Sequence, residues 1–103
     1  KNQFAIAVCP GDIESPTVLA AQTANELLDI SGINASFVLT VYQEKIYMSA
    51  RSIDEVNVQI IAEKLGGGGH INSAGAQFDH TNMEEAISTL KETIDDMIEK
   101  GDI

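Results

Sequence analysis

Residues 65–76 read LGGGGHINSAGA, with four consecutive glycines before a histidine. A glycine loses more conformational entropy on folding than any other residue and adds no side chain to a core, so an ordered run of four is costly. Without Cβ atoms, however, successive N–H groups can turn toward one point and bind an anion, and an imidazole beside them can add a donor or a positive charge. We therefore predict a phosphate-binding nest at Gly66, Gly67, Gly68, Gly69 and His70.

The glycine run is also compatible with a purely structural role. A flexible hinge, or a helix C-cap that has grown long, would be rich in glycine too. The familiar phosphate loops fit less well, because no Lys-Ser or Lys-Thr follows the glycines and Ile71 breaks the dinucleotide-binding fingerprint. A different kind of phosphate site is expected.

The composition indicates one acidic domain. The 103 residues, 44% of them hydrophobic, suffice for one core. The net charge of -10, from 16 acidic and 6 basic residues, argues against the broad basic face of a nucleic-acid-binding protein, so any phosphate binding must be local. No apolar run approaches the ~20 residues of a membrane span. Because the chain opens at Lys1 rather than at a methionine, we expect a piece of a longer protein. We expect this piece to be cytoplasmic.

Cysteine and histidine are too sparse to predict a metal site. The single cysteine, Cys9, lies in an apolar run and is expected to be a small buried side chain. The two histidines, His70 and His80, are far apart and belong to no cluster of metal-ligating residues. We therefore predict no metal ligands in this chain, and we interpret His80 as an exposed turn residue.

The first third of the chain predicts a strand followed by a helix. Residues 4–9 are continuously apolar, which is typical of a central strand buried on both faces. Ser15 as N-cap and Pro16 at the first position predict a helix that ends near Gly32. Its apolar residues, beginning with Val18, recur at helical spacing and predict the face that covers the sheet.

The middle of the chain predicts a hairpin. Residues 35–42 and 45–52 are rich in β-branched and aromatic side chains and are separated by only two residues. The period of two divides the second strand between two faces, with Ile46, Met48 and Ala50 on one and Tyr47, Ser49 and Arg51 on the other. A guanidinium suits phosphate or a purine edge, so Arg51 and the glycine loop are candidates to hold one ligand; a solvated or salt-bridged arginine is the alternative.

The remaining elements complete an α/β fold. A short helix capped by Asp54 or Asn57 runs into the glycines, and residues 74–78 predict a strand. Thr81 and Glu84 form an expected capping box for a final amphipathic helix, whose outer face is acidic. The prediction is a mixed sheet of about four strands with three main helices, in the order strand, helix, hairpin, helix, glycine loop, strand, helix.

The combined pattern resembles the DHH-associated domain, subfamily 1, which is the C-terminal substrate-binding domain of DHH phosphoesterases. The likeness rests on Ser-Ala-Arg-Ser at 49–52, Asn-Val-Gln at 57–59, the four glycines and histidine at 66–70, and Ala-Gly-Ala at 74–76. Within the family, the sequence is most similar to cyclic-di-AMP phosphodiesterases of the GdpP type. The likeness extends over nearly the full chain, so we expect residues 1–103 to form one such domain.

The resemblance implies a division of labour between two domains. In this family an upstream DHH domain, named for its Asp-His-His motif, holds two metal ions, usually manganese, and activates water. The associated domain closes over the cleft. Because the metal-binding DHH domain is absent from this sequence, the chain alone is expected to be inactive. By resemblance, Arg51 and the loop Gly66–His70 would hold a cyclic dinucleotide or short oligonucleotide, with Asn72 and Ser73 as further contacts. His70 would stabilise charge on the phosphate and is also a candidate proton donor.

Several alternatives stay open. The same glycine-histidine loop occurs in oligoribonucleotide or pAp hydrolases, in RecJ-type exonucleases and at the C-terminal end of alanyl-tRNA synthetases. A non-catalytic nucleic-acid-binding module is a different class of function, which the net charge of -10 disfavours. A purely structural or dimerisation domain would leave the glycines without a reason, although a homodimeric enzyme is compatible with the pattern. GdpP-type proteins are anchored to the membrane through segments that this sequence does not contain.

Overall fold

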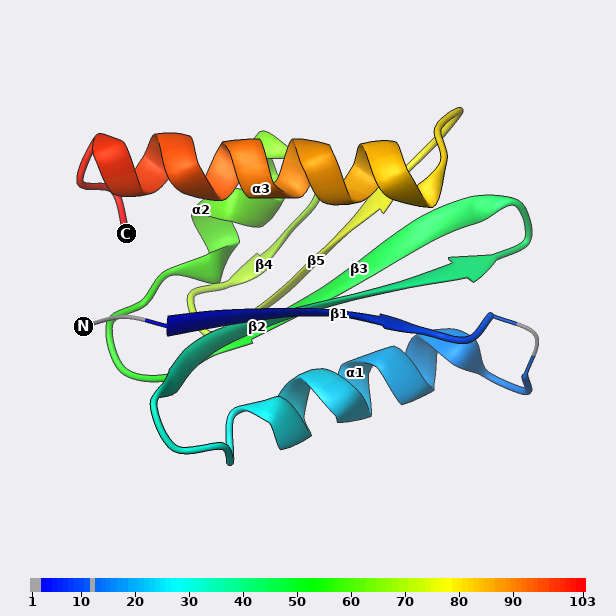
Figure 1. The fold of residues 1–103 in the computed structure, drawn as a ribbon, viewed down its shortest axis with the longest axis horizontal. Coiled ribbons are helices and arrows are strands. Elements are labelled where there is room, and N and C mark those ends of the chain that lie inside the picture. Colours follow the sequence, from blue (N-terminus) through cyan, green and yellow to red (C-terminus); the bar gives the residue numbers. More distant parts are fainter. Residues whose placement is uncertain (1–2, 12) are drawn as a thin grey trace.

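The computed structural model describes residues 3–11 and 13–103, which form a five-stranded mixed sheet with helices on both faces (Figure 1). The elements in chain order are β1 (Gln3–Cys9), α1 (Pro16–Leu27), β2 (Ile33–Tyr42), β3 (Lys45–Ser52), α2 (Val58–Lys64), β4 (Gly68–His70), β5 (Ser73–Phe78) and α3 (Met83–Glu99). The strand order across the sheet is β1-β2-β3-β5-β4. The predicted α/β class with three helices is confirmed, and the sheet gains one strand because part of the expected glycine loop is itself a strand.

The predicted hairpin is confirmed as β2 and β3, which lie in the interior of the sheet. Residues 35–40 of β2 are all buried. Gln43 and Glu44 connect the strands with φ of 52° and 67°, the two-residue turn whose twist matches that of the sheet. Along β3 the even-numbered residues 46–52 are buried, whereas Tyr47, Ser49 and Arg51 are half-buried on the opposite face. The predicted division of this strand between two faces is therefore confirmed.

β1 lies at the edge of the sheet, which corrects the prediction of a central strand. Its one partner among the described residues is β2, with which it runs parallel. Phe4 and Ile6 pack into the cluster that contains α3 residues, whereas Ala7 packs into the cluster of α1. Because helices cover both faces of this edge, an edge strand here needs the same continuous apolar run as a central one. The predicted burial on both faces is incomplete, because residues 4–7 are only half-buried and Val8 is 51% exposed.

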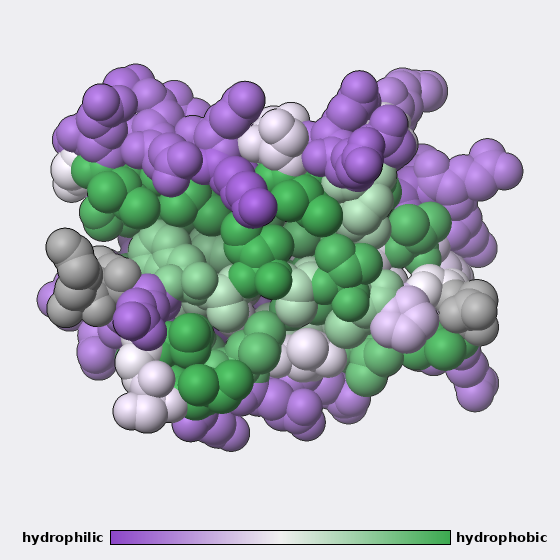
Figure 2. Space-filling view, in the orientation of Figure 1, coloured by the Kyte–Doolittle hydropathy of each residue, from purple (hydrophilic) through white to green (hydrophobic). Residues whose placement is uncertain are grey.

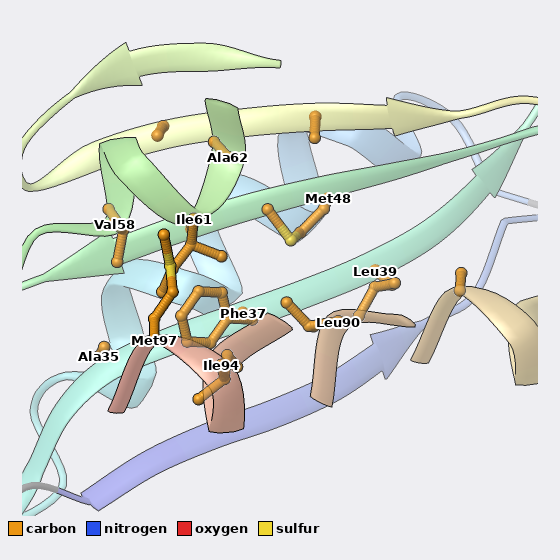
Figure 3. Packing of buried hydrophobic residues seen from close by; sticks show 14 of the residues in the cluster. Ala35, Phe37, Leu39, Met48, Val58, Ile61, Ala62, Leu90, Ile94 and Met97 are labelled. Carbon is orange, nitrogen blue, oxygen red and sulfur yellow. The ribbon is translucent and has the colours of Figure 1, made fainter. Parts of the chain in front are cut away.

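Two hydrophobic clusters hold the helices on opposite faces of the sheet. In the larger one, side chains of β2 point toward side chains of α2 and α3, as Figure 3 shows for Phe37, Leu39, Ile61, Leu90 and Ile94. The smaller one joins α1 to Cys9 of β1 and to Val38 of β2. Cys9 is buried, as expected.

α1 approaches the sheet through alanines. Ala20 and Ala24 are fully buried, whereas Val18, which was expected to face the sheet, is 53% exposed. The small side chains bring the helix so close that the hydroxyl of Ser36 in β2 donates to the carbonyl oxygen of Ala24 at 2.6 Å. Ser15 is the N-cap and Pro16 the first residue of the helix, as predicted, but Ser15 has φ of 57° and its side chain makes no capping hydrogen bond.

The N-caps of the other two helices are asparagines. Asn57, rather than Asp54, caps α2, and its side-chain oxygen accepts two backbone N–H groups. Asn82 caps α3 and accepts the N–H of Glu85 at 2.8 Å. The expected capping box starting at Thr81 is therefore wrong by one residue. Asparagine is as good an N-cap as serine or threonine, so the sequence pattern did not separate neighbouring candidates.

Figure 2 shows hydrophilic side chains along the outer side of α3, which agrees with the predicted acidic, solvated face of the last helix. An apolar band lies below it, where the edge strand β1 runs between α3 and α1. None of the helices in the described part of the chain combines the length and the apolar composition that a membrane crossing requires.

Candidate functional site

The glycine run first ends α2 and then becomes the edge strand β4. Gly66 (φ 90°) and Gly67 close the helix as a Schellman motif, in which their N–H groups donate to the carbonyl oxygens of Glu63 at 3.1 Å and Ala62 at 2.7 Å. The next three residues form β4, which pairs antiparallel with β5. The predicted anion nest therefore does not form at Gly66 and Gly67, because both N–H groups are already used. A helix C-cap accounts for these two glycines.

The fold requires glycine at three of the four positions. Gly66 needs it for its positive φ. A Cβ at Gly67 would overlap the carbonyl oxygen of Gly75, and one at Gly69 would lie 2.5 Å from the Cα of Ala74. Gly68 differs, because no described heavy atom lies within 4 Å of its missing Cβ and its φ is not in the left-handed region. Packing therefore gives no reason for glycine at this one position.

Strand register places three of the predicted site residues side by side. Arg51 of β3 pairs with Ser73 of β5, and Ser73 pairs in turn with His70 of β4. Directly paired residues of antiparallel strands project to the same face. We call these three residues the Arg51 row. The same register forms a second row, the Gly68 row, which consists of Ser49, Gly75 and Gly68.

Both rows lie on the α1 side of the sheet, where α1 leaves strands β5 and β4 uncovered. α1 packs on β1, β2 and β3, and α2 and α3 pack on the other face, so the α1 side of β5 and β4 is open (Figure 1). Ser73 and His70 are exposed, and Arg51 is half-buried. An open strip of sheet with a cation, a hydroxyl and an imidazole across three strands is a surface that can hold an anion.

Arg51 is held close to its own strand without a carboxylate partner. Its Nη1 donates to the carbonyl oxygen of Ala50 at 2.9 Å. The single ion pair within residues 3–11 and 13–103 joins Lys100 and Asp96 on α3. The salt-bridged alternative for Arg51 is therefore wrong within the described residues. A guanidinium has several N–H donors, so Arg51 can bind more than the carbonyl oxygen of Ala50.

Asn72 fastens the β4–β5 turn to the segment that precedes α2. Its amide nitrogen donates to the hydroxyl oxygen of Ser52 at 2.8 Å and to the carbonyl oxygens of Asp54 at 3.1 Å and Val56 at 3.4 Å. The Ser52 hydroxyl donates to the Val56 carbonyl at 2.6 Å. The side-chain nitrogen of Asn72 thus fixes the turn between His70 and Ser73, two residues of the Arg51 row. A contact of Asn72 with substrate stays a prediction.

Sequence reasoning did not single out Ser52. The signal that points to it is the strand alternation, which places this serine on the buried face next to Arg51. A hydroxyl there needs hydrogen-bond partners, and it finds them in the turn that carries Asn72.

A groove of about 380 Å³ adjoins the two rows on the same face. Ser49 and Gly75 of the Gly68 row line it, together with Tyr47, Gln77 and Thr17 of α1. A hollow of about 410 Å³ between α2 and the end of α3 contains none of the predicted site residues. His80 borders a third hollow at the β2–β3 turn and is exposed with φ of 57°, as expected for a turn residue. Of these three hollows, only the groove beside the two rows is lined by residues of a row, so it is the candidate ligand-binding groove.

Comparisons with known proteins show the family to which the chain belongs. The DHHA1 domain family matches residues 1–99. Cyclic-di-AMP phosphodiesterase PdeA of Listeria monocytogenes is 46% identical over 93 residues, which cover 89% of this chain and 14% of that protein. Cyclic-di-AMP phosphodiesterase GdpP of Bacillus subtilis is 43% identical over 104 residues, which cover 98% of this chain and 16% of that protein. The chain thus spans about one seventh of the length of these relatives.

A solved structure supports the fold. An exopolyphosphatase-related protein from Bacteroides fragilis superposes with a TM-score of 0.76 at 23% identity, over 87% of this chain and 28% of that one. Given the family match over nearly all of its length, the chain belongs to the DHHA1 domain family.

Proposed function

We propose that this chain is the substrate-binding domain of a DHH phosphodiesterase that hydrolyses cyclic-di-AMP, and that the Arg51 row holds a phosphate of the substrate. The observation that carries the proposal is the register that aligns Arg51, Ser73 and His70 on an open face. The names of the relatives supply the substrate class. Their greater length leaves room for an upstream DHH domain, with this chain as the C-terminal part of a longer protein.

The row offers three kinds of donor to one anion. Neighbouring strands are about 4.8 Å apart, so side chains at the same level of β3, β5 and β4 can meet around a group the size of a phosphate. The guanidinium supplies a planar fork and a fixed charge, the Ser73 hydroxyl a single donor, and the His70 ring an N–H. Donors already in place where charge develops on phosphoryl oxygens lower the barrier to hydrolysis.

Gly68 keeps the space beside the row free for the substrate. Its missing side chain would project onto the open face, because Gly68 pairs with Gly75 and thus belongs to the row next to Arg51. Gly66, Gly67 and Gly69 contribute indirectly, since they allow β4 to lie against β5 at the end of α2. His70 as proton donor to the leaving oxygen is a further role within the proposal.

The catalytic metals of the proposed enzyme lie outside this chain. Two divalent ions, manganese by family resemblance, would generate the attacking hydroxide in the DHH domain. The donor set here does not fit such a centre, because the described residues contain no group of three or more His, Cys, Asp or Glu side chains placed to bind a metal. The role proposed for this chain is accordingly binding and charge stabilisation in a cytoplasmic enzyme, without turnover by the domain alone. A homodimer stays a prediction.

Substitutions in the full-length enzyme test the proposal. Arg51→Ala and His70→Ala should each lower kcat/KM for cyclic-di-AMP by about 10² to 10³, as is typical for loss of one charge-stabilising donor. Lys45→Ala removes a cation from the exposed end of the same strand and serves as the control, with kcat/KM close to that of the parent. Metal content and melting temperature should not change in any variant.

The same assay separates the alternatives. Equal rates for Arg51→Ala and Lys45→Ala would show that the row does not hold the phosphate. Turnover of pAp or short oligoribonucleotides well above that of cyclic-di-AMP, with the same loss in Arg51→Ala, would keep the site and change the substrate.

A further inference from the structure

The groove of about 380 Å³ begins beside the Arg51 row and runs away from it. Ser49 and Gly75 line it and are each two residues from the row, or about 7 Å at the rise of a strand. Tyr47 and Gln77, which pair with each other, lie two residues farther, or about 13 Å from the row. One nucleotide can span this length. A nucleotide with its phosphate at the Arg51 row would therefore place its base in the groove.

The lining of the groove suits a flat ring. Gly66, Gly67 and Gly75 add no side chains, so much of the surface there is backbone. Tyr47 adds an aromatic ring, which is itself held in place by Tyr42 with 6.1 Å between the ring centroids. Nucleobases stack readily on such rings, whatever their sequence context. The groove volume also falls within the range of small-ligand pockets, roughly 300–1,000 Å³.

Gln77 gives the groove a hydrogen-bonding edge of known direction. Its Nε2 donates to Oδ1 of Asp79 at 2.8 Å. Because a carboxylate only accepts, this contact decides which end of the amide is nitrogen. The amide oxygen and the second N–H then stay available to a ligand. An acceptor beside a donor matches adenine, which presents its N6 amino group beside N7, whereas guanine presents two acceptors, O6 and N7.

Charge determines which end of a nucleotide lies at Gln77. The carboxylate of Asp79 beside Gln77 repels a phosphate, whereas Arg51 at the other end of the strip attracts one. The phosphate is thus expected at the Arg51 row and the uncharged base at Gln77.

We propose that this groove is a purine subsite that prefers adenine, with Gln77 as the residue that reads the base edge and Tyr47 as the stacking surface. The inference rests on the proposed function, because it takes the position of the phosphate from the Arg51 row. It adds a specificity determinant that lies four residues along the sheet from that row.

Direct binding to the 103-residue chain tests the subsite without metal or turnover. The probes are AMP, GMP and ribose 5-phosphate, and the measurements are amide chemical-shift changes and titration calorimetry. Gln77→Glu replaces the donor by a second acceptor, and Gln77→Leu removes both groups without adding charge. Both should weaken AMP about tenfold, the scale of one lost bidentate base contact, and bring the AMP to GMP ratio near one. Ribose 5-phosphate should bind Gln77→Leu as it binds the parent.

Gln59→Glu is the matched control. Its Nε2 also donates to a carboxylate, that of Glu63 at 3.2 Å, but it lies on α2 and does not line the groove. It should leave all three affinities unchanged.

The outcomes separate the subsite from the phosphate row. An AMP to GMP ratio that is the same in Gln77→Leu and the parent, or a preference of the parent for GMP, would overturn the adenine subsite. If Arg51→Ala still lost ribose 5-phosphate binding, the proposed function would stand. Adenine-selective binding that persisted in Arg51→Ala would instead keep the subsite and overturn the phosphate row. Absence of binding by all three probes would overturn both.

Discussion

The two faces of strands β3, β5 and β4 use the same backbone for different purposes. On one face Met48, Ala50, Ala74 and Ala76 are buried under the helices. On the other, the alternate residues form the Arg51 row and the Gly68 row, which are half-buried or exposed. Because successive side chains of a strand point in opposite directions, the packing of the buried side chains also fixes the positions of the side chains on the exposed face. The positions of the site residues are therefore determined mainly by the packing of the residues on the buried face.

The largest effect on stability is expected from the buried face of the sheet. Phe37 of β2 is fully buried and makes an edge-to-face contact with Phe4 at 6.1 Å between ring centroids. Phe37→Ala should lower the free energy of unfolding by about 3–5 kcal/mol, measured by denaturant titration. Val8→Ala, at a half-exposed position of β1, is the control and should change it by about 0.5 kcal/mol or less. Similar losses in both variants would mean that the core is not centred on β2.

A smaller but sharp loss is expected where β4 meets β5. A Cβ at Gly67 would overlap the backbone carbonyl oxygen of Gly75, which cannot move without disturbing the sheet. Gly67→Ala should therefore destabilise the chain by about 3 kcal/mol, at the upper end for overpacking. Thermal unfolding followed by circular dichroism measures it. A melting temperature equal to that of the parent would show that the two strands are not in close contact at this point.

The hydrogen bonds behind the Arg51 row contribute less. Asn72→Ala removes the donor to the Ser52 hydroxyl oxygen and to the Asp54 carbonyl, while the Val56 carbonyl keeps its bond from Ser52, and this should cost about 1–2 kcal/mol. Asn25→Ala, an exposed position on α1, is the control. Since the turn positions His70 and Ser73, phosphate binding should weaken along with stability. If binding were lost with no change in the free energy of unfolding, Asn72 would be a direct substrate contact instead.

Much of the fold could be predicted because its local signals agree with its packing. The hairpin and its two faces follow from β-branched residues with a period of two and a two-residue turn. Two predictions were wrong, each for its own reason. β1 looks central because helices cover both of its faces, and β4 looks like a loop because glycine is a poor strand former.

The site residues could be named from the sequence, but not their arrangement. Arg51 and His70 are 19 positions apart, and only the pairing of each with Ser73 brings them into one row. The sequence alone does not distinguish the four glycines from one another. They separate into a helix cap, two close contacts and one open position only when the neighbouring strand is known.

Gly68 gives the sharpest test of the difference between the two faces, because packing within the domain does not require a glycine at this position. Gly68→Val should change the free energy of unfolding by no more than about 1 kcal/mol, since no described atom lies within 4 Å of the new Cβ and valine favours strands. The branched side chain would nevertheless stand on the open face beside the Arg51 row and exclude a phosphate.

We expect this variant to lose cyclic-di-AMP binding in a metal-loaded, slowly hydrolysing form of the full-length enzyme, as measured by calorimetry. Gly68→Ala, with a smaller side chain, should lose less, so that affinity falls in steps with side-chain volume while the melting temperature stays constant. That graded loss distinguishes a steric block from a folding defect, which would lower both quantities together. Parent-like affinity in Gly68→Val would mean that the substrate does not approach this face, and the phosphate site would have to be sought elsewhere on the domain.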